Sequence, residues 1–534
     1  MNDTQDADIV IVGAGVAGSM VAHQLAMAGK SVLILEAGPR VPRWQTVERF
    51  RNQPDKGDMS EAYPNPPWAP APHYSKPHDY YIQKGAIVYA SEYLRMVGGT
   101  TWHFTANTWR FRPNDFKEKS TFGVGRDWPI SYDDLEPYYY KAEVEIGVTG
   151  DQDYGSPRKQ PYPMRQPPTP YAEKVAMELL NAFNPEFNVT TQPACRASRP
   201  YDGRPTCSGN NNCSPICPIG AMYNGIMHVE KAEHAGARVL ENAVAYKIEV
   251  GPDRKIKAVH YKDSQGASHR IIGKYFVLAS HTIETPKLML ISTSGDYPNG
   301  VGNSSGMVGR NLMDHPKTSV TFYSGKPLWP GRGPEQSTSM IGYCDGAFRS
   351  TMAAKKIQNW DLNVTLSETQ KIFKEGKLLK PAALNARIRD RASRFMSYNS
   401  YHEILPLPTN RVVPSKTEKD AIGIPRPEIY WNVDDYVKRG AAHTRKVFAD
   451  IVSVLGGSET EYDDTFGTSQ HPVGTTIMGN DPRDSVVDAD CRSFDHQNLF
   501  IASGAVMASV STFNITLTIA ALALRVADTL KKEV

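Results

Sequence analysis

Hydrophobic positions near the N-terminus form a continuous run, recur with a helical period, and then form a second run. Residues 8–12 and 31–35 are short and almost wholly apolar, as in strands buried on both faces, whereas residues 16–27 place apolar side chains at helical spacing. A glycine-rich turn, Gly13-Ala-Gly15-Val-Ala-Gly18, joins the first strand to the helix, and Glu36 follows the second strand. This order within about thirty residues is the one that a dinucleotide-binding unit requires.

The rest of the chain alternates irregular stretches with regular ones. Six prolines between residues 64 and 77 predict an excursion over the surface, and a second proline-rich stretch, residues 156–170, precedes a helical pattern that starts near Tyr171. Residues 323–463 have strands of their own and a charged helical stretch at 382–395, which indicates a second domain inserted into the first.

Composition and charge narrow the class of protein. Of the 534 residues, 40% are hydrophobic and 22% charged, as in a soluble globular protein. A net charge of +3 is too small for the footprint of a nucleic-acid binder. The apolar stretch at residues 515–524 is too short to span a bilayer, and the polar, acidic residues 1–8 do not resemble an export signal, so we expect neither feature in this chain.

The glycines and the acidic residue of the first unit each have a physical role. Gly13 allows a tight turn, Gly15 lets the backbone approach a pyrophosphate, and Gly18 lets the helix pack closely on the strand. The helix N-terminus offers free N–H groups to phosphates. Glu36 would accept hydrogen bonds from a ribose and repel a 2′-phosphate, which disfavours NADP and leaves FAD and NAD open.

Four further segments carry a resemblance to a known family. They are Gly98-Gly99-Thr100-Thr101-Trp102-His103, Asn303-Ser304, Gly309-Arg-Asn-Leu-Met-Asp-His315-Pro and the C-terminal run from Asn514 to Asp528. With the N-terminal glycine turn, they resemble the signature set of the glucose–methanol–choline (GMC) oxidoreductases, which are FAD enzymes that oxidise alcohols. The resemblance extends over essentially the whole chain.

The resemblance implies an α/β (α+β) fold in which an antiparallel-sheet substrate domain is inserted into a Rossmann-like FAD domain. We expect the FAD domain to comprise residues 1–150, 196–322 and 466–534, and the substrate domain residues 323–465, with 151–195 as a connection and part of the substrate domain. Gly98, Gly99 and Thr100 would then lie close to the flavin ring. His103 falls where some relatives attach the flavin covalently, and an ordinary hydrogen-bonded histidine is the alternative interpretation.

Two residues match the family's catalytic positions. His471, in Gln470-His471-Pro472, matches the base that takes the hydroxyl proton while hydride leaves for flavin N5, and Asn514 matches its partner, which orients the substrate oxygen. The resemblance also implies that the helix after Asn514 points its N-terminus at the flavin. His315 precedes a proline, so we interpret it as part of a structural turn. Trp102, Phe104, Trp109, Asn363 and Tyr401 are candidates for lining the substrate pocket.

A compact cysteine cluster adds a second redox candidate. Cys207, Cys213 and Cys217 are separated by glycine and asparagines that can take left-handed turns around a small inorganic core. Three ligands favour a [3Fe–4S] cluster over a [4Fe–4S] cluster, for which Cys195 is the nearest additional thiol. Structural zinc and a disulfide are the alternatives.

The cysteine loop narrows the resemblance to the catalytic subunits of bacterial FAD-dependent glucose, fructose and sorbitol dehydrogenase complexes. That group implies a dehydrogenase rather than an oxidase, a small signal-bearing subunit, a multihaem cytochrome c subunit and a periplasmic location, with the membrane reached only through the cytochrome. A sugar-acid dehydrogenase of the same fold, which would need an Arg or Lys in its pocket, remains an alternative. A non-catalytic electron-transfer protein is a third hypothesis.

Overall fold

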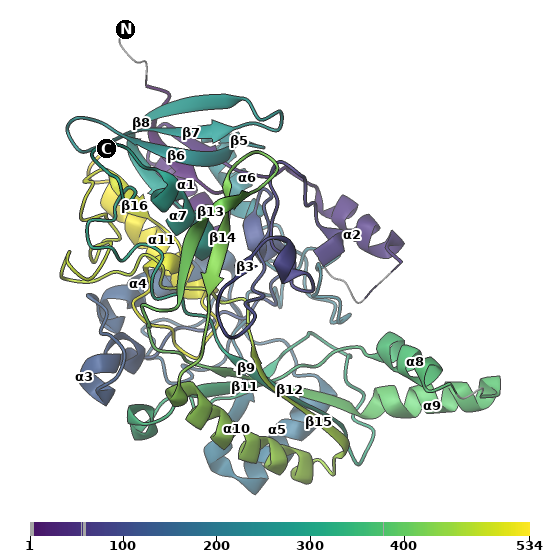
Figure 1. Cartoon of the computed structure of the whole chain (residues 1–534). Coiled ribbons are helices and arrows are strands. Elements are labelled where there is room, and N and C mark those ends of the chain that lie inside the picture. The colour runs from purple at the N-terminus through teal and green to yellow at the C-terminus, as the bar shows by residue number, and fades with distance from the viewer. Residues whose placement is uncertain (1–4, 55, 57–59, 377–378) are drawn as a thin grey trace.

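The computed structural model describes residues 5–54, 56, 60–376 and 379–534. Residues 1–4, part of the segment in which we expect no export signal, lie outside this description. The described chain forms two layered bodies, each built on one large sheet, and α1 (Val16–Met27) lies in the upper body beside α11 (Thr516–Leu530) (Figure 1). No described helix combines the length and the apolar character that a bilayer span requires.

The first sheet has seven strands and contains both ends of the chain. Its order is β5-β2-β1-β8-β7-β6, with β16 also paired to β8. Strands β5, β2, β1, the end of β8 and β16 are parallel, whereas β6, β7 and the start of β8 form an antiparallel meander. The strands are β1 (Ala7–Val12), β2 (Val32–Leu35), β5 (Arg238–Leu240), β6 (Val244–Val250), β7 (Ile256–Lys262), β8 (Ser268–Leu278) and β16 (Leu499–Ile501).

Helix α1 (Val16–Met27) joins β1 to β2 and packs against α11 (Thr516–Leu530) and α6 (Ile226–His234). The predicted strand, helix and strand at the N-terminus are thus confirmed to within a residue at each end. Strands β1 and β2 are apolar and buried at almost every position, as expected of parallel strands that are covered on both faces. α11 begins two residues after Asn514, with Ile515 as its N-cap.

The second sheet has six antiparallel strands in the order β15-β9-β12-β11-β10-β4. Helices α5 (Tyr171–Phe183) and α10 (Asp435–Val454) cover one of its faces (Figure 1). Its strands are β4 (Val189–Thr191), β9 (Lys317–Tyr323), β10 (Thr338–Met340), β11 (Lys355–Asn359), β12 (Phe395–His402) and β15 (Ser458–Gly467). The pattern that starts near Tyr171 is therefore a helix, as predicted.

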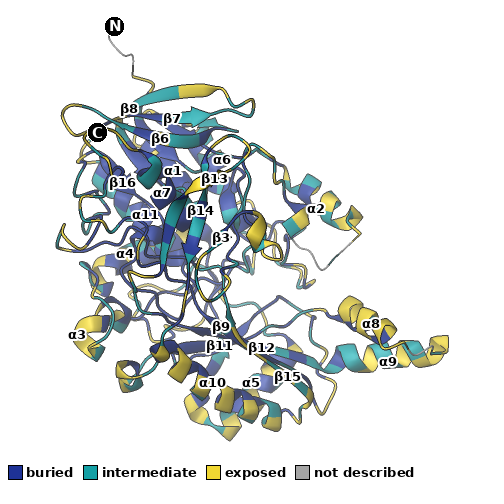
Figure 2. Ribbon diagram, in the orientation of Figure 1, coloured by how far each residue is buried: buried dark blue, intermediate teal, exposed yellow. Residues whose placement is uncertain are grey.

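The remaining elements lie at the periphery or between the bodies. A small sheet of β13 (Arg411–Lys419), β14 (Pro425–Tyr430) and β3 (Ile82–Gln83) lies between the two large ones. Helices α8 (Thr365–Lys374) and α9 (Pro381–Arg394) form an arm that projects from the lower body and is exposed along much of its surface (Figure 2). The predicted charged helical stretch is α9. Helices α2 (Arg43–Asn52), α3 (Glu118–Phe122), α4 (Tyr132–Ile146) and α7 (His281–Ile291) complete the set used below.

Candidate active site

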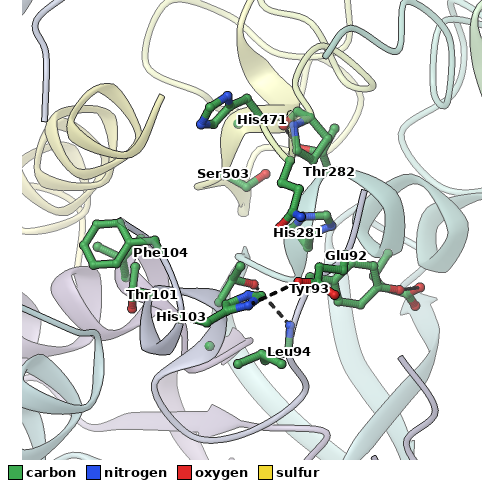
Figure 3. Close-up of a pocket in the computed structure, with 18 of the residues that line it drawn as sticks. Glu92, Tyr93, Leu94, Thr101, His103, Phe104, His281, Thr282, His471 and Ser503 are labelled. Carbon is green, nitrogen blue, oxygen red and sulfur yellow. Dashed lines mark hydrogen bonds and ion pairs between the residues drawn. The ribbon is translucent and has the colours of Figure 1, made fainter. Parts of the chain in front are cut away.

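A cavity of about 570 Å³, which we call the central cavity, connects the N-terminal glycine turn to residues of the second sheet. It brings together eight of the predicted site residues: Gly13, Gly15, Glu36, Gly99, Thr100, His103, His471 and Asn514. His103 and His471 come from segments far apart in the sequence and appear together around this cavity in Figure 3. The first turn of α11 lines the cavity too, through Thr516 and Ile519.

Gly18 and Gly99 are packed too tightly to accept a side chain. A Cβ on Gly18 would lie 2.0 Å from the carbonyl oxygen of Gly13, and one on Gly99, whose φ is +62°, would lie 2.8 Å from the Cα of Gly15. The loop that carries Gly98 and Gly99 therefore lies directly against the N-terminal glycine turn. Gly18 and Gly98 do not line the cavity, but their lack of a side chain allows this close packing. The backbone of the glycine turn at the cavity wall is therefore accessible to a ligand.

Glu36 closes the end of the cavity next to β2. Its carboxylate accepts hydrogen bonds from the backbone N–H groups of Ala14 (2.9 Å) and Gly38 (3.0 Å). Burial raises the pKa of this carboxyl to about 7, although the two hydrogen bonds act in the opposite direction. A ribose diol that donates to Glu36 would favour the ionised form, so the residue fits the role that the sequence predicts for it.

His103 lies in the cavity wall with one nitrogen held and the other without a partner. Nδ1 lies 3.3 Å from Glu92 Oε1, whereas Nε2 is buried and has no hydrogen-bond partner (Figure 3). Burial alone would raise the pKa of Glu92, but the hydrogen bonds from His103, Ser60 and the backbone of Tyr74 lower it to about 2. The histidine is thus oriented by a carboxylate and keeps a free nitrogen.

The predicted catalytic pair is in direct contact. Nε2 of His471 and Nδ2 of Asn514 lie 3.0 Å apart, and Nδ1 of His471 lies 3.1 Å from Nδ1 of His315. His315 is bonded through Nε2 to the carbonyl oxygen of Ser511. On the other side of the pair, Lys356 of β11 donates from Nζ to Oδ1 of Asn514.

Burial sets the protonation of this group. It lowers the pKa of His471 well below the usual range and that of His315 to about 3, and the nearby Lys356 acts in the same direction on both. Burial also lowers the pKa of Lys356 to about 7. His471 is therefore neutral at physiological pH and able to accept a proton.

Neutral amides line the wall of the cavity near this pair. Gln336 Oε1 accepts from Nδ2 of Asn107 (2.8 Å) and from Nε2 of Gln358 (3.0 Å), and all three residues line the cavity. Nε2 of Gln336 is buried without a partner. A buried donor of this kind is costly unless a ligand accepts from it, so the wall suits a substrate with several hydroxyl groups.

The cysteine loop forms another part of the same wall. Ser214 and Pro215, between Cys213 and Cys217, line the cavity, while Glu335 Oε1 accepts from the backbone N–H of Cys213 (3.1 Å). Gly209 and Asn211 have φ values of +64° and +54°, which confirms the left-handed turns expected of this loop.

All six cysteines are free thiols, so the alternative of a disulfide is wrong for the described structure. The ligands of one tetrahedral zinc ion at 2.3 Å lie about 3.8 Å apart. Among the described residues, the one group whose ligand atoms lie within 4.8 Å of one another is His23, Glu145 and His228. The three thiols of the loop are not such a group, which favours a cluster, whose cysteines each bind a different iron, over a single ion.

Three of the loose pocket candidates do not line the cavity. Trp102 packs under the Arg43 guanidinium (5.2 Å), Trp109 stacks on Phe513 (4.7 Å), and Asn363 bonds Asn211 of the cysteine loop. Phe104 and Tyr401 do line it. The aromatic residue type alone did not distinguish a core position from a pocket position.

The sequence analysis missed three residues of the site. His315 stood in a segment that we quoted and interpreted only as a turn, whereas it also contacts His471. Lys356 and Gln336 carried no local signal in the sequence. The fold brings Gln336, which precedes β10, to the cavity wall and Lys356 of β11 to the side of Asn514.

Comparison with known proteins assigns the class. Family models described as GMC oxidoreductase match residues 217–317 and 406–523, and one described as FAD dependent oxidoreductase matches residues 8–49. The chain belongs to the GMC oxidoreductase family and is an FAD-dependent dehydrogenase that acts on CH–OH groups. The residues that fit FAD are those that line the central cavity described above.

Among individual proteins, the chain is 46% identical to the fructose dehydrogenase large subunit of Gluconobacter japonicus, over 99% of this chain and 98% of the relative. It is 26% identical to a 2-methyl-1,2-propanediol dehydrogenase of Mycolicibacterium austroafricanum, over 98% and 94%. Its fold matches the crystal structure of pyridoxine 4-oxidase from Mesorbium loti with a TM-score of 0.64 at 18% identity, over 98% and 99%.

Proposed function

We propose that this protein is the catalytic subunit of a sugar dehydrogenase that oxidises one hydroxyl-bearing carbon of a sugar or polyol to a carbonyl. Glucose, fructose and sorbitol are the substrate class, and the 46% identity to a fructose dehydrogenase large subunit favours fructose. The bound FAD supplies the hydride acceptor. His471 takes the hydroxyl proton at Nε2, and Asn514 donates from Nδ2 to the substrate oxygen.

One observation carries the proposal: a half-buried, neutral His471 faces Asn514 in a cavity that continues to the glycine turn and Glu36. A base is useful only if it is unprotonated beside the reacting hydroxyl, and burial provides that state. The unpartnered amide of Gln336 supports a substrate with additional hydroxyl groups over a simple alcohol.

We further propose that electrons leave through a [3Fe–4S] cluster held by Cys207, Cys213 and Cys217. The three free thiols, the left-handed turns between them and the place of Ser214 and Pro215 in the cavity wall support this assignment. A cluster beside the flavin gives electrons a route out one at a time. The acceptor would be a multihaem cytochrome c subunit, and a small signal-bearing subunit would direct the complex to the periplasm.

A sugar acid is the second candidate substrate, and Lys317 is the observation that favours it. Lys317 lines the cavity and, among the described residues, forms no ion pair with a carboxylate within 4.0 Å; its ammonium lies 5.8 Å from the centre of the Tyr74 ring. Such a cation could pair with a substrate carboxylate. Gluconate and 2-keto-gluconate therefore belong in the same test.

The test is anaerobic absorbance of the purified protein during titration with fructose, glucose, sorbitol, gluconate and 2-keto-gluconate, followed by low-temperature EPR of the oxidised sample. We expect fructose to bleach the flavin and the oxidised sample to show a three-iron signal. If only a sugar acid bleaches the flavin, the proposed sugar or polyol substrate is wrong and a sugar acid is the substrate. If the purified protein contains no iron, the proposed [3Fe–4S] cluster is wrong.

The assignment of His471 is tested in the same titration with His471→Ala. The variant should retain flavin and lose bleaching by about 100-fold or more in rate, as expected for loss of a general base. His443→Ala removes a half-buried histidine of α10 that does not line the cavity, and it should bleach normally. Equal rates for His471→Ala and the unaltered protein would refute the assignment.

A further inference from the structure

The hydrogen bonds around the catalytic pair form one chain, and its direction follows from chemistry alone. The carbonyl oxygen of Ser511 can only accept, so Nε2 of His315 carries a proton. Since burial keeps His315 neutral, its Nδ1 is an acceptor and receives the Nδ1–H of His471 at 3.1 Å. Neutral His471 therefore has its lone pair on Nε2, toward Asn514.

The contact at the Lys356 end of this series of hydrogen bonds also indicates that the lone pair of His471 is on Nε2. In its charged form Lys356 can only donate, so the atom of Asn514 that contacts it is then the amide oxygen. The amide nitrogen of Asn514 then faces His471 and donates to the lone pair on Nε2 at 3.0 Å. Without Lys356, nothing in this contact would keep the amide from turning over and pointing its oxygen at the base.

Lys356 is placed for this task and for no other visible one. It is 1% exposed, lies over the rings of Trp109 (5.5 Å) and Tyr401 (5.3 Å), and does not line the central cavity. No carboxylate lies within 4.0 Å of it among the residues that the structure describes. A buried lysine without a counter-ion is costly, and such groups are typical of functional sites.

We propose that Lys356 is a positioning residue, which fixes the amide of Asn514 with its nitrogen toward His471 and, with His315 at the opposite end, keeps the lone pair of His471 on Nε2, where a substrate hydroxyl takes the place of the Asn514 N–H and gives up its proton. This inference rests on the proposed roles of His471 and Asn514. It adds a residue from the second sheet to a pair that comes wholly from the C-terminal segment.

The test compares Lys356→Met with Lys356→Gln. Methionine fills the buried space without a donor, whereas glutamine keeps an N–H donor and loses the charge. We expect Lys356→Met to keep its flavin and to lower kcat about 100-fold, with a smaller change in KM, because misorientation of a reacting group acts on the chemical step. Lys356→Gln should recover most of kcat.

The pH profile separates positioning from a merely structural role. The titratable groups that face Lys356 are His471, His315, Cys344 and Tyr401. Below about pH 7 the Lys356 charge disfavours protonation of His471, so both substitutions should move the acidic limb of kcat to higher pH. A purely structural lysine would leave that limb unmoved.

Lys355 provides the matched control. It is the preceding residue of the same strand and is likewise buried, but unlike Lys356 it has no hydrogen-bond partner at Nζ, and it lies over Tyr343 (5.1 Å). Lys355→Met should leave kcat and the pH profile unchanged. Equal kcat in Lys356→Met and the unaltered protein would overturn the inference, and so would equal losses in the Met and Gln variants. Failure of the unaltered protein to bleach with any substrate would instead overturn the proposed function.

Discussion

Gln336 holds the cavity wall together through its amide oxygen and offers its amide nitrogen to a ligand. We predict that Gln336→Leu lowers kcat/KM for the preferred sugar about tenfold to a hundredfold, because a hydrogen bond to a substrate hydroxyl is lost in a buried site. Steady-state kinetics with an artificial electron acceptor measures the effect.

The control for Gln336→Leu uses deoxy analogues, each of which lacks one hydroxyl group of the sugar. Deoxy analogues of the sugar should lose activity with the unaltered protein, and the analogue that lacks the contacted hydroxyl should lose nothing further in Gln336→Leu. If every analogue is penalised equally by the substitution, Gln336 shapes the wall without contacting the sugar.

His103 presents a free, buried Nε2 to the cavity while Glu92 holds its other nitrogen. This arrangement favours covalent attachment of the flavin over the alternative of a fully hydrogen-bonded histidine. We predict that acid-denatured protein keeps its yellow colour and that His103→Ala releases it. His281→Ala, which alters another buried histidine of the same cavity, should keep the colour, and release of flavin from the unaltered protein would exclude attachment.

For single residues, the sequence was most informative where the residue type itself indicates a structural or chemical role. Several of the predicted glycines, together with the histidine and asparagine in family segments, line the same cavity. Lys356 and Gln336 were not predictable, because a lysine in a strand and a glutamine in a loop are ordinary surface residues until the fold buries them. The catalytic, cofactor-binding and metal-binding roles themselves stay predictions.

Among the elements, the cysteine loop is the one in which a substitution should separate flavin reduction by the sugar from electron transfer to the cytochrome. We predict that Cys217→Ser lowers bound iron and stops electron transfer to a cytochrome c, while anaerobic bleaching of the flavin by sugar persists, since the catalytic pair lies elsewhere on the wall. Iron analysis and stopped-flow absorbance measure both. Cys195→Ser is the control because Cys195 is buried outside the loop, against Ala106. Loss of iron in that variant would indicate four cysteine ligands and contradict the three-iron assignment.

Helices and strands with a strong local pattern were predictable, and pairings between distant segments were not. The first strand, helix and strand follow directly from apolar periodicity. By contrast, the second sheet takes β4 from residues 189–191 and β15 from residues 458–467, one at each edge. Nothing local in either strand specifies that edge. The exact domain boundaries likewise stay a prediction.

For the molecule as a whole, the prediction concerns where it is found. If a small signal-bearing subunit carries this protein across the inner membrane, expression with the neighbouring genes should place it in the periplasmic or membrane-associated fraction, and expression of this chain alone should leave it in the cytoplasm. Cell fractionation followed by immunoblotting measures the distribution. Cytoplasmic protein in both experiments would refute the proposed location.

Gly13, which follows the first strand of the FAD sheet, and Asn514 both line the central cavity, although some five hundred residues separate them in the sequence. At about 5–20 residues per second, a ribosome needs roughly 25–100 s to pass from one to the other. Throughout that interval the nascent glycine turn exists without a base, an amide or the first turn of α11 beside it. Translation itself therefore delays assembly of the redox centre until nearly the entire polypeptide has emerged.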